Sequence, residues 1–164
     1  MNKQYHPSYI ETHDIDWFCK IGNQLIHCAS NGGNLPEKVN NRNQNRKIQE
    51  IVANLDDIIE SRDEIAVNDE YVYVRLGQNE SPEAYNNYIA SFAAMAKKGF
   101  MSFDKMINRP GTDVYMWIAK PKRQVEVEIE NLPVYDSSAC RRFSRRGDII
   151  HVDCLDQSEM EIEK

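Results

Sequence analysis

The sequence lacks long hydrophobic runs. None of its segments approaches the roughly 20 apolar residues that a helix needs to cross a bilayer. The first residues, Met1 to Tyr9, are polar and hold no apolar core of the kind that marks a signal peptide. We therefore expect a protein with no membrane contact that stays in the cytoplasm.

Cysteine is scarce, and its spacing lacks the common metal-binding motifs. The chain has four cysteines (Cys19, Cys28, Cys140 and Cys154), which form no CxxC pair, and it has no HExxH motif. Cytoplasmic thiols stay reduced, and zinc sites usually show closely paired ligands. We therefore predict no disulfide and no metal site.

Glycine-rich phosphate loops are missing as well. Only seven glycines occur, and neither GxGxxG nor GxxxxGK[ST] is present. Those patterns place backbone N–H groups around the phosphates of dinucleotides and nucleoside triphosphates. Their absence excludes the Rossmann and Walker types of nucleotide site, and we predict no cofactor.

Positive charge is in deficit. The chain has 20 basic and 26 acidic residues, which gives a net charge of -6. Such a molecule repels nucleic acid at long range, so a nucleic-acid partner is disfavoured without being excluded. The charge is unevenly spread, because residues 153–164 are acidic whereas 120–123 and 141–146 are basic. A protein partner or a homodimer remains open.

Aromatic residues, in contrast, are plentiful. Eight Tyr, five Phe and two Trp supply ample area for a hydrophobic core. A chain of 164 residues suits one domain with one core. We predict a single α+β domain over residues 1–156, followed by an acidic tail over 157–164.

The clearest local pattern is a β-hairpin near the N-terminus. Two aromatic and β-branched runs, residues 14–21 and 24–30, are separated by Gly22-Asn23, which is typical of a two-residue turn. The resulting register places Trp17, Cys19, Ile21, Ile26 and Cys28 on a core face. It places Asp16, Phe18, Lys20, Leu25, His27 and Ala29 on the opposite face.

The rest of the chain predicts two main helices and several strands. A capping box at Asn34 to Glu37 opens the first helix, which is clear over 45–55, and Ser81-Pro82 opens a second that stops at Gly99. The predicted strands are 64–67, 71–76, 100–103, 114–119, 124–130 and 148–155. We predict a largely antiparallel sheet of about six strands with both helices packed on one face.

His27 and Asp16 form the first candidate site. They lie diagonally on one face of the hairpin, where a carboxylate can orient an imidazole that acts as a general base. The alternative is a half-exposed histidine that only hydrogen-bonds to a surface carboxylate. His151 and Asp153 share a face of the last predicted strand and would join this pair if the two strands were neighbours.

Gly32 and Gly33 form the second candidate site, in a loop between a strand and a helix. Backbone N–H groups in such a loop can hold a phosphate or a carboxylate. The alternative is a turn that needs glycine for a positive φ angle.

The third candidate is a cluster of Arg141, Arg142, Arg145 and Arg146. Arginine presents paired N–H donors that suit phosphate or carboxylate groups, so this cluster predicts a site for an anion or an acidic partner. Lys120, Lys122 and Arg123 would extend it if the fold brings the segments together. The run from Cys140 to Arg146 fits the bare Cys-x5-Arg pattern of cysteine phosphatases, but it lacks their glycines. A solvated basic loop, or ion pairs with the Glu126–Glu130 segment, explains the arginines equally well.

Two functions are consistent with these sites. The first is a small binding or regulatory module that contacts a protein or an anionic partner through the arginine cluster. The second is a small hydrolase or transferase that acts on an anionic substrate with His27 as base and Asp16 as orienter. The sequence favours the first slightly and leaves open whether the chain is an enzyme.

Overall fold

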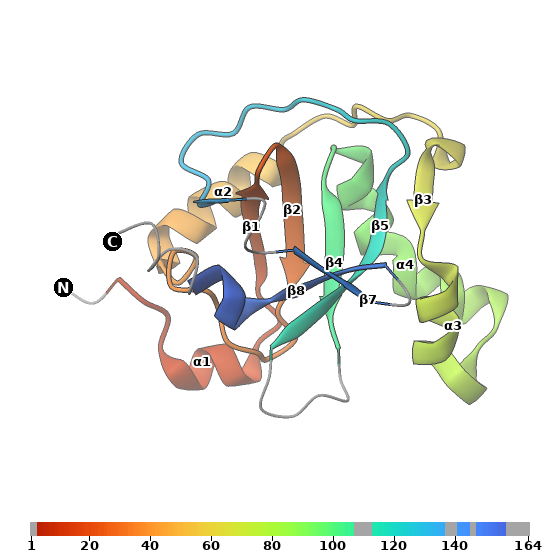
Figure 1. Cartoon of the computed structure of the whole chain (residues 1–164), viewed down its shortest axis with the longest axis horizontal. Helices are drawn as coiled ribbons and strands as arrows, with labels where there is room; N and C mark the ends of the chain where they lie inside the picture. The colour runs from red at the N-terminus through yellow and green to blue at the C-terminus, as the bar shows by residue number, and fades with distance from the viewer. Residues whose placement is uncertain (1–2, 107–112, 137–140, 145–146, 157–164) are drawn as a thin grey trace.

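The computed structural model describes residues 3–106, 113–136, 141–144 and 147–156, which form one β-sheet covered by helices (Figure 1). The helices are α1 (Pro7–Thr12), α2 (Arg42–Ala53), α3 (Asp69–Leu76) and α4 (Pro82–Lys97), with 3-10 turns η1 (Arg62–Glu64) and η2 (Gly77–Asn79). The strands are β1 (Asp16–Ile21), β2 (Gln24–Ala29), β3 (Ile65–Val67), β4 (Met101–Lys105), β5 (Val114–Pro121), β6 (Val134–Tyr135), β7 (Arg141–Ser144) and β8 (Gly147–His151). The α+β class with a single sheet is confirmed.

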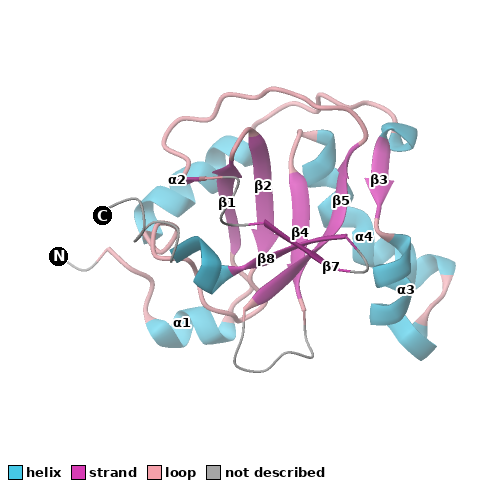
Figure 2. Ribbon diagram, viewed as in Figure 1, coloured by secondary structure: helices cyan, strands magenta, loops and turns pink. Residues whose placement is uncertain are grey.

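The sheet is mixed, so the largely antiparallel sheet of about six strands was wrong in detail. Among the described residues it has eight strands, in the order β6-β1-β2-β4-β5-β8-β7, with β3 paired to β5 beside this path. The β2–β4 and β1–β6 pairs are parallel. The long connection from β2 to β4 carries α2, α3 and α4 before the chain returns beside β2 (Figure 2). Sequence neighbours alone do not reveal such a crossover.

The β1–β2 hairpin has the predicted register. Ile21 pairs with Gln24, and Trp17 pairs with Cys28. Gly22 in the turn has a φ of 59°, which a residue with a side chain adopts only at a cost. The Gly-Asn signal therefore fixed the alignment of both strands.

Both faces of this hairpin are buried, which the alternation of residue types did not reveal. On one face Phe18 and Leu25 pack with Ile48 and Val52 of α2, while Ala29 packs with Phe92 of α4. On the other face Trp17 contacts Tyr115 edge-on, with ring centroids 5.5 Å apart. The face that was expected to carry half-exposed residues thus lies under helices α2 and α4.

Residues 71–76 were predicted as a strand, but they belong to helix α3. The Asn68 side chain caps this helix by accepting a hydrogen bond from the backbone N–H of Tyr71 at 3.3 Å. Asp69 and Glu70 lie in the first turn, where carboxylates stabilise the helix dipole. The alternating Tyr and Val residues suggested β-structure, and the capping signal outweighs it.

Residues 124–130 were also predicted as a strand, but no ladder forms there among the described residues. The segment is irregular and passes beside the β1–β2 turn at one end of the sheet (Figure 1). Val125, Val127 and Ile129 are half-buried against the apolar clusters, while the intervening glutamates are exposed. Apolar and charged residues therefore do alternate between buried and exposed positions. This alternation comes from the packing of an irregular segment and not from a strand.

Helix boundaries agree with the predictions at α4 and differ elsewhere. Ser81 caps α4, because its hydroxyl accepts the N–H of Ala84 at 3.0 Å. Helix α2 is capped by Asn41, seven residues after the predicted Asn34 cap. Helix α1 was not predicted, and residues 152–156 are helical where a strand had been expected to continue. The predicted acidic tail, 157–164, lies outside the described residues.

None of the helices in the described part of the chain is both long enough and apolar enough to span a membrane.

Candidate functional site

Three residues on neighbouring strands form one row at the end of the sheet. Asp16 of β1 pairs with Ala29 of β2, and Ala29 pairs with Asp104 of β4. Paired residues point to the same face, and strands lie about 4.8 Å apart, so the two carboxylate residues are separated by roughly 10 Å between Cα atoms. Ala29, whose side chain is a single methyl group, lies between them.

This row opens into a cavity of about 350 Å³ between the sheet and helices α3 and α4. Its lining residues are Asp14, Asp16, Ala29, Asn31, Arg75, Tyr88, Ser91, Phe92 and Asp104. The cavity lies where the parallel strands β2 and β4 both end. Strand ends of this kind often carry binding sites, because loops there can vary without disturbing the sheet.

His27 lies directly behind Asp16. Its Nε2 atom is 2.8 Å from Asp16 Oδ1, and its Nδ1 atom is 2.6 Å from Ser102 Oγ. An ionised carboxylate only accepts hydrogen bonds, so Nε2 carries the proton that is donated to Asp16. In the neutral imidazole the Ser102 hydroxyl then donates to Nδ1. The diagonal contact expected from the hairpin register is therefore present.

Solvent reaches only one end of this hydrogen-bonded chain. His27 is 1% exposed and Ser102 is fully buried, whereas the Asp16 side chain is 50% exposed. The three residue types match a Ser-His-Asp triad, but a substrate carbonyl cannot reach the Ser102 hydroxyl. The hydrogen bonds from Ser102 through His27 therefore orient Asp16 toward the cavity. They do not activate Ser102 as a nucleophile.

Two side chains from helices α3 and α4 contact the carboxyl group of Asp104. Tyr88 donates its hydroxyl proton to Asp104 Oδ2 at 2.5 Å, and Arg75 Nη2 lies 3.2 Å from the same oxygen. Burial raises the pKa of Asp104 above the usual aspartate value, although the Tyr88 hydrogen bond and the Arg75 charge oppose this rise. Asp104 therefore holds a proton over a wider pH range than an exposed aspartate does.

Arg75 and Tyr88 are themselves fixed in place. The Arg75 guanidinium lies over the Tyr88 ring, 5.2 Å from its centroid, and donates to the backbone oxygen of Lys105 at 3.2 Å. Burial lowers the pKa of Arg75, but the negative charge of Asp104 and the nearby tyrosines outweigh it, so the net pKa is raised. Burial and Asp104 both raise the pKa of Tyr88, which therefore stays neutral and donates.

The charge of the cavity disfavours an anionic ligand. Among the described residues that line it, Asp14, Asp16 and Asp104 contribute three carboxyl groups, and Arg75 contributes one cation that is already paired with Asp104. Asp14 accepts the backbone N–H of Asn31 at 2.9 Å and supplies further negative potential. Uncharged or cationic molecules fit this electrostatic environment better than the anionic substrate expected from the sequence.

His151 does not join the site. It lies on β8, which is separated from β2 by β4 and β5 in the sheet. The pair of His27 and Asp16 would have met the pair of His151 and Asp153 if their strands were neighbours. Because β2 and β8 are not neighbours, the two pairs lie in different parts of the molecule.

Gly32 and Gly33 form a tight turn whose backbone donors are occupied. The N–H of Gly32 donates to His13 O at 3.1 Å, and the N–H of Gly33 donates to Ser30 O at 2.8 Å. Gly32 has a φ of 80°, and an added Cβ would lie 2.9 Å from the backbone oxygen of Glu11. These observations support the turn interpretation and leave neither N–H group for an anion.

The predicted arginine cluster falls largely outside the described residues. Arg145 and Arg146 are not described, and Cys140 is not described either. The backbones of Arg141 and Arg142 lie on β7, at one end of the strand order, paired with Ile150 and Ile149 of β8. The role of this cluster in binding an anion or a partner stays a prediction.

Sequence reasoning missed Asp104, Ser102, Arg75 and Tyr88. One signal was available for two of them, because Ser102 and Asp104 interrupt an otherwise apolar strand on alternate positions. No signal linked Arg75 or Tyr88 to them, because both lie on helices whose packing is set by the fold. In the described part of the chain, no three His, Cys, Asp or Glu side chains are arranged to hold a metal ion.

Comparisons of the chain with protein-family models, with curated proteins and with solved structures gave no match.

Proposed function

We propose that this protein is a small hydrolase that cleaves a glycosidic bond in an uncharged substrate at the Asp16–Asp104 cavity. The observation that carries the proposal is the row of Asp16, Ala29 and Asp104 across three neighbouring strands. Two carboxyl groups on either side of the scissile bond are the catalytic pair of most glycoside hydrolases. The binding of an anionic partner, which the sequence favoured, requires a different surface.

The two carboxyl groups take different roles. We assign the role of proton donor to Asp104, because burial raises its pKa above the usual aspartate value although the Tyr88 hydrogen bond and the Arg75 charge oppose this rise. Asp16 is the proton acceptor, because it is half-exposed and receives the N–H of His27. A pair with one protonated and one ionised member is what acid–base catalysis requires.

The reaction then proceeds with one water molecule. Its oxygen bonds to the anomeric carbon while its proton passes to Asp16. The bond between that carbon and the leaving oxygen breaks, and the leaving oxygen takes the proton of Asp104. This direct attack by water inverts the anomeric carbon. Inverting enzymes hold their two carboxyl groups about 6.5–9.5 Å apart, a gap that the Cα separation of roughly 10 Å between Asp16 and Asp104 can provide. Exchange of protons with solvent restores both groups.

The walls of the cavity indicate the substrate class. Phe92 and Tyr88 present aromatic side chains from α4, and Asn31 and Ser91 add polar groups. Sugar rings combine an apolar face with hydroxyl groups, so they match this lining. The net negative charge disfavours phosphorylated sugars. We also propose that the protein acts in the cytoplasm, as the sequence analysis leads us to expect.

Hydrolysis of 4-nitrophenyl glycosides tests the proposal, with 4-nitrophenyl phosphate as the anionic comparison. We expect release of nitrophenol from at least one uncharged glycoside and none above background from the phosphate. Asp16→Asn and Asp104→Asn should each reduce kcat about 100-fold or more, the usual contribution of a general acid or base.

Asp57→Asn is the matched control, because Asp57 is exposed and lies outside the cavity. It should keep wild-type activity. Turnover that survives in both cavity variants, or that occurs only with the phosphate ester, would show that the proposed function is wrong.

A further inference from the structure

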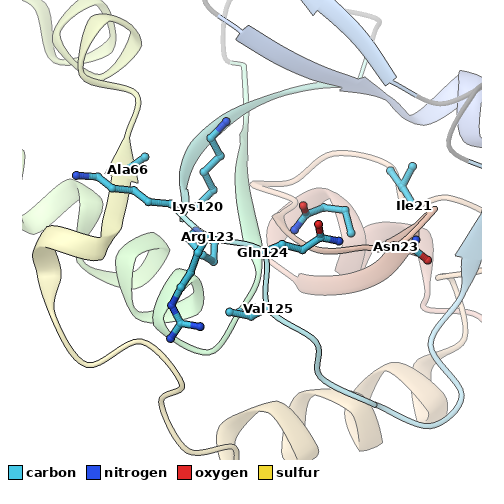
Figure 3. A pocket seen from close by; sticks show the side chains of 11 residues that line it. Ile21, Asn23, Ala66, Lys120, Arg123, Gln124 and Val125 are labelled. Atoms are coloured by element: carbon cyan, nitrogen blue, oxygen red, sulfur yellow. The ribbon is translucent and has the colours of Figure 1, made fainter.

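A second cavity lies at the opposite end of the central strands and has the opposite charge. It measures about 570 Å³ and lies beside the β1–β2 turn and the end of β5 (Figure 3). Its lining residues are Ile21, Asn23, Gln24, Ala66, Gly99, Lys120, Pro121, Lys122, Arg123, Gln124 and Val125. We call it the basic cavity. It shares no residue with the Asp16–Asp104 cavity.

Of the described residues, three cations and no carboxylate line the basic cavity. Within the described residues, Lys120, Lys122 and Arg123 form no ion pair. Lys120 Nζ lies 4.7 Å from the centroid of the Trp117 ring, and Arg123 Nη2 is 3.5 Å from the backbone oxygen of Ile58. Neither contact neutralises a charge. On a chain with a net charge of -6, such a concentration of uncompensated cations is a distinct local feature.

The backbone beneath these cations is fixed. Lys120 pairs with Ala66 in the β3–β5 ladder, and Pro121 pairs with Ile65. The N–H of Lys122 donates to Glu64 O at 2.8 Å. The cationic side chains therefore project from an ordered strand end, which reduces the entropy that is lost when a ligand binds.

The size and the remaining lining indicate a small polar ligand. The volume lies within the range of about 300–1,000 Å³ that is typical of small-molecule sites. Asn23, Gln24 and Gln124 add amide groups that can both donate and accept hydrogen bonds. In Figure 3 the Lys120 and Arg123 side chains extend from their segment in different directions. Three cations on one short segment can contact more than one anionic group, so they suit a ligand with two or more phosphate groups better than a single phosphate.

We propose that the basic cavity binds a small polyanion that carries at least two phosphate groups, through Lys120, Lys122 and Arg123. Arginine and lysine are the usual partners of phosphate oxygens, and the amide side chains would contact the remainder of the ligand. A long nucleic-acid strand fits less well, because none of the described residues that line the cavity is aromatic and could stack on a base. This site is independent of the proposed hydrolase activity.

Isothermal titration with inorganic tripolyphosphate tests the proposal on the full chain. We expect saturable binding that weakens at least about tenfold when KCl is raised to about 0.5 M, because salt screens exposed charges. The emission of Trp117 should change in the same titration, since Lys120 lies against its ring. Trp17 lies on β1, is fully buried and does not line the basic cavity, so it should contribute no change.

Lys122→Glu/Arg123→Glu is the decisive variant. Both side chains are exposed, so the fold should tolerate the change, and affinity should fall about tenfold or more. Arg42→Glu/Lys47→Glu changes two exposed cations of α2 by the same charge and should leave affinity within about twofold.

Three outcomes would overturn the proposal. The first is the absence of saturable binding up to about 10 mM tripolyphosphate. The second is equal weakening in both double variants, which would indicate a general charge effect. The third is tighter binding of a single-stranded oligonucleotide than of tripolyphosphate with the same dependence on Lys122 and Arg123.

Discussion

His27 Nδ1 lies 2.6 Å from Ser102 Oγ, and both side chains are closed off from solvent. The two residues are register partners on the parallel strands β2 and β4. A buried imidazole that bonds on both sides is part of the core as well as part of the site. Changes at His27 should therefore alter stability and activity together.

His27→Ala should lower the free energy of unfolding by about 2–4 kcal/mol, since it leaves a cavity and a buried hydroxyl without its partner. Urea denaturation followed by tryptophan emission measures this loss. His13→Ala, at an exposed histidine, should cost less than about 1 kcal/mol. If His27→Ala were as stable as the wild type, the interpretation of His27 as a core residue would be wrong.

The raised pKa of Asp104 should make the stability of the fold depend on pH with a sign that is unusual for an aspartate. Its folded pKa is raised by burial, so between the ordinary value of about 3.9 and the folded value the native state holds a proton that the unfolded chain has released. The stabilisation from Asp104 is fully present below the ordinary value and is lost as pH rises through the folded value.

Urea denaturation of the wild type and of Asp104→Asn over a pH series measures this effect. We expect the stability of the wild type relative to Asp104→Asn to fall as pH rises through that window. Most aspartates in ion pairs give the opposite slope, because their folded pKa is depressed. A relative stability that rises with pH would show that the Arg75 charge, and not burial, dominates at Asp104.

Above the folded pKa of Asp104, Arg75→Met should cost about 3 kcal/mol, because it leaves the ionised Asp104 carboxylate buried without its cation. The double variant Arg75→Met/Asp104→Leu should recover most of this loss, since it removes both charges. Thermal melts of the two single variants and the double variant measure the coupling. Additive effects would mean that the two side chains contribute independently.

The sequence predicted what depends on local signals. The Gly22-Asn23 turn gave the hairpin register and with it the contact between His27 and Asp16. Ser81 and Pro82 likewise predicted the start of α4. Each of these features is decided by residues within a few positions of one another.

The rest of the site depends on a long-range pairing. Asp104 lies beside Asp16 only because β4 returns in parallel next to β2, and no local pattern specifies that return. The Val125 to Ile129 alternation misled for a related reason, since burial against helices gives the same period as a strand. Local sequence therefore predicted half of the carboxylate pair, and the topology supplied the other half.

Gly32 and Gly33 are neighbours with different constraints, and they give a matched pair of variants. An alanine at Gly32 must adopt a φ near 80° and places its Cβ 2.9 Å from the backbone oxygen of Glu11, which cannot move without disturbing α1. We expect Gly32→Ala to cost about 2 kcal/mol or more.

The atoms nearest to an added Cβ at Gly33 belong to the side chains of Asp113 and Lys105, at 2.7 and 2.9 Å. These side chains can shift at the expense of their partly exposed ion pair of 3.6 Å. Gly33→Ala should therefore cost less than about 1 kcal/mol. Urea denaturation of both variants measures the difference. Because the two N–H groups already bond within the turn, addition of phosphate should stabilise the two variants and the wild type equally. A phosphate effect that disappears only in the Gly32 and Gly33 variants would instead restore the loop as an anion site.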